Sequence, residues 1–70
     1  MYRRLRELRK KRGLSQRTLA ELLGVSQQTY SRYERGRRRL SVQAAVTLAQ
    51  LYHVSVDYLL EITDESKPYW

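Results

Sequence analysis

Seventy residues suffice for one small domain, and the absence of cysteine excludes disulfides, thiolate metal sites and cysteine nucleophiles. Fourteen Lys and Arg against seven Asp and Glu give a formal net charge of +7, which favours a polyanionic partner. No apolar run approaches the roughly twenty residues of a membrane span, and no apolar stretch follows the first arginines. We therefore expect no membrane contact and no signal peptide, and place the chain in the cytoplasm.

The positive charge is concentrated in the first half of the chain. Residues 1–12 contain seven Lys or Arg and one Glu, and residues 25–41 contain five Arg and one Glu, whereas residues 42–70 contain four acids and one Lys. The first of these segments predicts a basic helix over Tyr2–Arg12 with Leu5 and Leu8 facing inward. Its arginines are candidates for contacts with phosphate.

The stretch from Ser15 to Gly36 predicts two short helices joined by a tight turn. Ser15 and Ser26 are helix caps, and Gly24 is suited to the left-handed turn between the helices. The first helix is expected to bury its leucines together with Ala20, whose small side chain lets the second helix cross closely; these leucines are Leu19, Leu22 and Leu23. In the second helix Tyr30 and Tyr33 recur three apart, and the residues around them are polar. This pattern predicts a helix-turn-helix whose second helix is shaped to enter a DNA major groove.

Two more helices are predicted after a loop that contains three consecutive arginines. Gly36 ends the preceding helix, and the loop guanidiniums suit phosphate oxygens. Ser41 caps a helix over Val42–Tyr52, with Ala45, Leu48, Ala49 and Tyr52 as its buried stripe. Ser55 caps a short helix over Val56–Leu60. His53 falls in the turn between them and has no ligand partner at suitable spacing, so we expect a turn or cap role and no metal site.

The last residues differ from the rest of the chain. Pro68 and the acidic residues argue against a further helix, and residues 63–70 are expected to form a tail behind a domain over residues 1–62. Ile62, Tyr69 and Trp70 are candidates for a dimer patch or for packing back on the domain.

At this level of detail the sequence resembles the lambda-repressor-like, Cro-type helix-turn-helix family, often called XRE. The match extends from about Leu5 to Leu60, and it rests on motifs at the family's spacing: Gly13-Leu14-Ser15-Gln16, Leu19-Ala20, Gly24-Val25-Ser26, Tyr33-Glu34 and Gly36. The resemblance implies an all-α, five-helix domain with the helix-turn-helix at helices 2 and 3. It also implies sequence-specific binding to double-stranded DNA, usually as a symmetric dimer.

The resemblance also implies roles for individual residues. Side chains on the second helix of the motif correspond to base-reading positions: Gln27, Gln28, Thr29, Ser31 and Arg32. A second set of side chains corresponds to phosphate-binding positions: Gln16, Arg35 and Arg39. Arg37 and Arg38 lie in the arginine loop between Arg35 and Arg39 and are candidates for the same role. Gln16 is also expected to brace the reading helix. Arg9 and Glu34 correspond to a structural ion pair between helix 1 and the end of helix 3.

Two positions depart from the family pattern. Leu40 stands where the family often has proline before a helix cap, which predicts a more mobile loop. Tyr30 stands where the family usually has Ile or Val, and the extra hydroxyl predicts that this side chain leans towards the surface.

The expected function is that of a small transcriptional regulator, a repressor that reads a palindromic operator as a dimer and uses no cofactor. Glutamine matches the N6 and N7 edge of adenine, and arginine matches the O6 and N7 edge of guanine. The alternative is an antitoxin-type module that binds DNA and also holds a protein partner through its tail. RNA binding is less favoured because the tyrosines follow core spacing, and an enzyme is not expected because the chain lacks a nucleophile with a base partner.

Overall fold

The computed structural model describes residues 3–61 and Ser66. It contains five helices in this part of the chain: α1 (Arg3–Lys11), α2 (Gln16–Leu23), α3 (Gln27–Glu34), α4 (Val42–Tyr52) and α5 (Val56–Leu59). The predicted all-α, five-helix fold is therefore confirmed. Helices α1 and α5 each end one residue earlier than predicted. The expected boundary between residues 62 and 63 lies outside the described residues, as do Ile62, Tyr69 and Trp70.

Local chemistry at the helix ends explains where the helices begin. Ser15, Ser26, Ser41 and Ser55 each accept a hydrogen bond from the backbone N–H three residues further on, so each satisfies a donor that the helix itself leaves unpaired. All four caps are those that the sequence predicts.

Two helices end on a residue in the left-handed region. Gly24 ends α2 with φ 69°, a conformation that costs glycine little. His53 ends α4 with φ 56°, so the lone histidine occupies the cap position expected of it.

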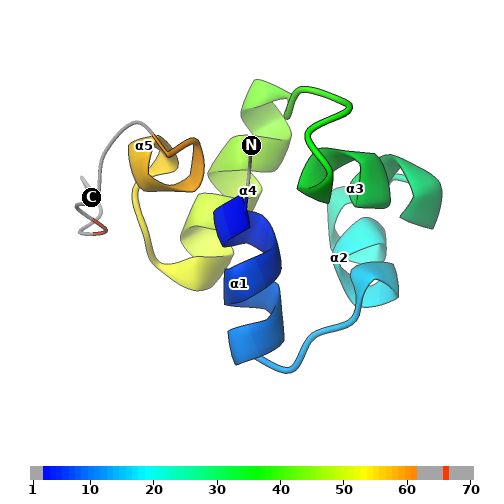
Figure 1. The fold of residues 1–70 in the computed structure, drawn as a ribbon, viewed down its shortest axis with the longest axis horizontal. Coiled ribbons are helices and arrows are strands. Elements are labelled where there is room, and N and C mark those ends of the chain that lie inside the picture. Colours follow the sequence, from blue (N-terminus) through cyan, green and yellow to red (C-terminus); the bar gives the residue numbers. More distant parts are fainter. Residues whose placement is uncertain (1–2, 62–65, 67–70) are drawn as a thin grey trace.

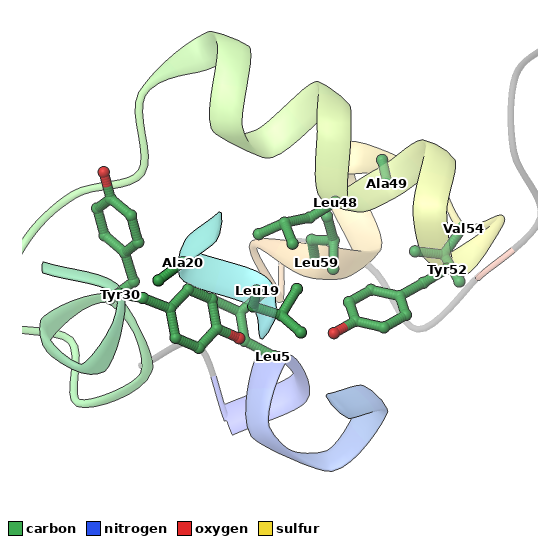
Figure 2. Packing of buried hydrophobic residues seen from close by; sticks show 10 residues of the cluster. Leu5, Leu19, Ala20, Tyr30, Leu48, Ala49, Tyr52, Val54 and Leu59 are labelled. Carbon is green, nitrogen blue, oxygen red and sulfur yellow. The ribbon is translucent and has the colours of Figure 1, made fainter. Parts of the chain in front are cut away.

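Helix α4 lies in the middle of the domain (Figure 1). Helix α1 lies beside it, the α2–α3 pair lies on one side, and α5 lies on the other. The core forms where these helices meet, and Figure 2 shows Leu5, Leu19, Leu48 and Leu59 gathered there from α1, α2, α4 and α5. All four leucines are fully buried. The packing therefore holds the α2–α3 pair against the rest of the domain.

The structure overturns two expectations about burial. Leu22 was expected to face the core, but 53% of it is exposed because α2 directs Leu19 and Ala20 inward. Tyr30 was expected to lean towards the surface, but it is fully buried. Its ring packs edge-on against Tyr33, with ring centroids 6.3 Å apart and an interplanar angle of 89°. Burial of so large an aromatic surface outweighs the cost of enclosing its hydroxyl.

Two arginines, Arg4 in α1 and Arg12 just after it, donate to backbone carbonyls of α5 and α4, a role that the basic composition alone did not predict. Arg4 donates to the carbonyl of Tyr58 at 2.9 Å, and its guanidinium lies 4.0 Å from the centre of the Tyr58 ring. Arg12 reaches the carbonyls of Leu51 and Tyr52 at 3.5 Å, at the end of α4 where carbonyls lack helical partners. These contacts direct part of the basic helix towards the protein rather than towards a phosphate.

None of the helices in the described part of the chain is long and apolar enough to cross a membrane.

The contrast between Leu19 and Leu22 gives a test of the packing. Leu19→Ala should lower the free energy of unfolding by about 2–5 kcal/mol, because it opens a cavity in a closed core. Leu22→Ala on the same helix should lower it by about 1 kcal/mol or less, because that side chain is half in solvent. Urea unfolding followed by circular dichroism measures both. Equal losses for the two variants would contradict the placement of α2.

Candidate nucleic-acid interface

Helix α3 presents one polar face to solvent and one aromatic face to the core. Gln27, Gln28 and Arg32 are exposed, whereas Tyr30 and Tyr33 are buried on the opposite side. The cap residue Ser26 accepts from the backbone N–H of Thr29 at 3.1 Å and donates to the Thr29 hydroxyl at 2.9 Å. The first turn of α3 is therefore held in place while its glutamines remain free to reach a ligand.

The exposed face of α3 continues into an open hollow against the start of α2. Gln16, Gln27, Gln28, Ser31 and Arg35 line it. The structure thus brings together residues that the sequence assigned to base reading and to phosphate binding. Ser31 is half-buried, so less of it is accessible in this hollow than of the exposed Gln27 and Gln28.

The other predicted phosphate-binding side chains lie just after α3. Gly36 has φ 71°, and the Arg37 N–H donates to the Arg32 carbonyl at 2.9 Å, so the chain turns sharply as the helix ends. Arg37, Arg38 and Arg39 are all exposed in the loop that follows. The turn therefore keeps this run of positive charge next to the α3 surface.

Arg9 and Glu34 form a bidentate ion pair beneath this surface. Arg9 Nε donates to Glu34 Oε2 at 2.6 Å, and Arg9 Nη2 donates to Glu34 Oε1 at 3.2 Å. Arg9 Nη1 also donates to the Leu14 carbonyl at 3.0 Å. The pair links α1 to the end of α3, which is the link that the resemblance implies, and the contact with Leu14 adds the α1–α2 turn. The side chains are only 12% and 3% exposed, so water screens the interaction weakly.

Gln16 adds a third donor to the same carboxylate. Its Nε2 atom lies 3.1 Å from Glu34 Oε1, which ties the first residue of α2 to the last residue of α3. The predicted bracing role of Gln16 thus has a specific geometry. The contact with Glu34 was not predicted, because nothing in the spacing of two residues 18 apart shows which atoms meet.

The pKa of Glu34 reflects this set of donors. Burial by itself raises the pKa of the carboxyl, but hydrogen bonds to its charged form, above all from Arg9, bring the pKa below its ordinary value of 4.5. The hydrogen bond to Glu34 likewise raises the pKa of Arg9. Both partners are therefore charged at neutral pH.

Burial also affects the two tyrosines of the core near this pair. It raises the pKa of Tyr52 to about 12 and raises that of Tyr30 further. Both phenols stay neutral at physiological pH, so Arg9 and Glu34 are the charges of this cluster.

The fold and this surface define a helix-turn-helix domain with a polar, basic face. The model of the helix-turn-helix family matches residues 5–59. The chain belongs to the XRE-type helix-turn-helix family, as its sequence motifs indicate.

Several relatives carry names of regulators. The chain is 43% identical over 65 residues to the uncharacterized HTH-type transcriptional regulator YobD of Bacillus subtilis, covering 93% of this chain and 58% of YobD. It is 47% identical over 57 residues to the HTH-type transcriptional regulator AnsR of the same organism, covering 81% of this chain and 49% of AnsR. The chain thus spans about half the length of these relatives.

A solved structure of similar size supports the same assignment. The restriction-modification controller protein C.AhdI from Aeromonas hydrophila superposes with a TM-score of 0.71 at 40% sequence identity, covering 83% of this chain and 88% of that one. A transcriptional regulator from Listeria innocua superposes with a TM-score of 0.74 at 30% identity, covering 94% of this chain and 59% of that one.

The Arg9–Glu34 pair gives a test with an internal control. Arg9→Met should lower the free energy of unfolding by about 3–5 kcal/mol, because it leaves a buried carboxylate without its counter-charge. The double variant Arg9→Met/Glu34→Leu should recover part of that loss. Arg17→Met breaks an exposed pair with Glu21 and should cost about 0.5 kcal/mol or less.

The same variants test the pH dependence. Because the pKa of Glu34 is lowered on folding, its contribution is present above pH 4.5 and is lost as the pH falls through the lowered value. Denaturant unfolding at pH values from 7 to 3 should show a smaller acid loss in Arg9→Met/Glu34→Leu than in the wild type. Identical acid loss in the two proteins would contradict the ion pair as described.

Proposed function

We propose that this chain binds double-stranded DNA in a sequence-specific manner and acts as a transcriptional repressor. The proposal rests on one observation, which is that α3 has one buried face and one exposed polar face. Tyrosines and Glu34 anchor one face, and exposed polar side chains extend from the other beside a run of exposed arginines. A helix held in this way fits the major groove, where a rigid polar face can meet base edges.

The proposed contacts fall into two groups. Five side chains of α3 reach base edges: Gln27, Gln28, Thr29, Ser31 and Arg32. Five others bind phosphates and set the register without reading sequence: Gln16, Arg35, Arg37, Arg38 and Arg39. The exposure of the glutamines and of the loop arginines supports this division.

A homodimer on a palindromic operator completes the proposal, because one α3 reads only a few base pairs. Two copies would read half-sites about 34 Å apart, one helical turn of DNA. The surface that supports self-association is an apolar groove between the start of α4 and α5, in which Val42 is 82% and Val46 is 41% exposed. An exposed apolar patch of this kind is typical of a surface that a partner covers. Ile62, Tyr69 and Trp70, the dimer candidates from the sequence, lie outside the described residues, so this part of the proposal rests on the α4–α5 groove.

Selection of bound duplexes from random DNA tests base reading against phosphate binding. Gln28→Ala should relax the base preference at one position of the selected half-site, because it removes a bidentate contact worth about 1–3 kcal/mol. Arg39→Ala should weaken binding to all sequences alike and reduce the slope of log affinity against log salt by about 0.9. Failure of the wild-type protein to select any duplex would contradict the proposed function.

Substitutions in the α4–α5 groove test the dimer. Val42→Glu and Val46→Glu should give a monomer by sedimentation and should abolish preference for two-half-site duplexes over one-half-site duplexes. Gln50→Glu, at an exposed position of the same helix, adds the same charge outside the groove and should leave assembly unchanged. A monomeric wild type at high concentration on palindromic DNA would contradict this part of the proposal.

A further inference from the structure

The side of α1 that faces away from the core carries three cations. Arg3, Arg6 and Lys10 are exposed, whereas Leu5 is fully buried and Leu8 packs against the core. Each residue of a helix advances by about 100°, so the three cations fall on one side and the two leucines point the other way. At a rise of about 1.5 Å per residue, the cations extend over about 10 Å of the helix. We call these three residues the α1 stripe.

The described part of the chain contains little that could neutralise the α1 stripe. Arg6 and Lys10 have no ion-pair partner there. Arg3 Nε lies 3.9 Å from Glu61 Oε1, but the Arg3 side chain is 84% exposed, so water screens this contact strongly. The charge of the α1 stripe is therefore available to a partner outside the domain.

Two of these charges also lie where they cost the helix stability. Helix α1 has no acidic residue in its first turn, and Arg3 and Arg6 lie there, at the positive end of the helix dipole. Arg6 and Lys10 are four residues apart, a spacing at which like charges repel. Glu7 is the single acid in the sequence of this helix and offsets only part of the charge. Departures from the local rules of stability are typical of positions that serve a ligand.

The α1 stripe fits the phosphate backbone of a nucleic acid. It contains no apolar side chain, whereas protein interfaces depend on buried aromatic or apolar anchors. Contacts between cations and phosphates need no such anchor, because released counterions supply the free energy. Duplex DNA carries about one charge per 1.7 Å of its axis, so three cations spread over about 10 Å can meet several phosphates at once.

The α1 stripe and the exposed face of α3 point in different directions. Arg9 points from α1 towards the end of α3, where it pairs with Glu34. The middle of the α1 stripe lies about a quarter of a turn round the helix from Arg9. Figure 1 shows α3 at the edge of the domain, to one side of α1. A duplex against the exposed face of α3 therefore leaves the α1 stripe free to meet another.

We propose that the α1 stripe binds the phosphate backbone of a second duplex, so that one domain bridges two segments of DNA. This inference rests on the proposed function, because the first duplex is the one that α3 reads. The second duplex is held without regard to its sequence, since contacts with phosphates carry no sequence information directly. A copy bound at its operator thus brings another stretch of DNA to that place.

Capture of a second duplex by an assembled complex tests this inference. The duplex that the wild-type protein selects is fixed to beads, loaded with one copy of the protein per half-site and washed. A fluorescent duplex of equal length without a half-site is then added. The loaded beads should retain it and beads with DNA alone should not. Retention should fall steeply between about 50 mM and about 200 mM salt, because contacts with phosphates depend on released counterions.

Substitutions in the α1 stripe should remove this capture and leave the first duplex in place. Arg6→Gln/Lys10→Gln should weaken binding of the second duplex about tenfold or more and reduce its slope of log affinity against log salt by about 1.8. Affinity for the selected duplex should not change. Arg6→Gln alone should reduce the slope by about 0.9. Arg17→Gln removes the same charge from an exposed position of α2, outside the α1 stripe, and should retain capture.

Urea unfolding gives a reading that does not depend on DNA. Arg6→Gln should not lower the free energy of unfolding, because the charge that it removes is repelled by Lys10 and by the helix dipole. A loss of stability in this variant would show that Arg6 has a structural role and would overturn the inference.

The binding results separate this inference from the proposed function. If Arg6→Gln/Lys10→Gln lowers the affinity and the salt slope for the selected duplex, the α1 stripe contacts the duplex that α3 reads, and a second duplex is excluded. Unchanged capture in that variant, or no capture by a wild type that selects a duplex, also overturns the inference and leaves the proposed function in place. If the wild type selects no duplex, both fail.

Discussion

The bidentate contact between Arg9 and Glu34 is the constraint on which the candidate interface depends. Glu34 is the last residue of α3, and Arg9 lies in the last turn of α1, which packs on the core. With the Leu14 carbonyl as a third point of attachment, the pair fixes the α1–α2 turn and the end of α3 together. A charge pair with this little exposure is costly to form without full hydrogen bonding, and both of its partners have that bonding here.

The aromatic face of α3 supports the same arrangement by packing. Tyr30 and Tyr33 enter the core from one helix, with Tyr30 fully enclosed. Aromatic side chains bury a large area with few rotatable bonds, so they fix a short helix at little cost in conformational entropy. Helix α3 is only eight residues long and is too short to be stable in isolation. Its orientation therefore comes from the core and the ion pair together.

Basic residues in this chain serve two different purposes. Arg4 and Arg9 of α1, and Arg12 just after this helix, donate to carbonyls of the domain or to Glu34. The loop arginines after α3 remain exposed. Net charge alone does not separate these roles, because composition counts cations without regard to the groups they face. The exposed basic surface is accordingly smaller than the charge of the chain suggests.

Much of this protein was determined by local sequence. The serine caps, the left-handed Gly24 and His53, the helix-turn-helix spacing and most of the core positions follow from chemistry within a few residues of each one. The burial of Tyr30, the exposure of Leu22, the inward arginines and the contact of Gln16 with Glu34 were decided by the tertiary structure. Each of these depends on how helices distant in sequence lie against one another, and periodicity within a single helix carries no information about the partner that the helix meets.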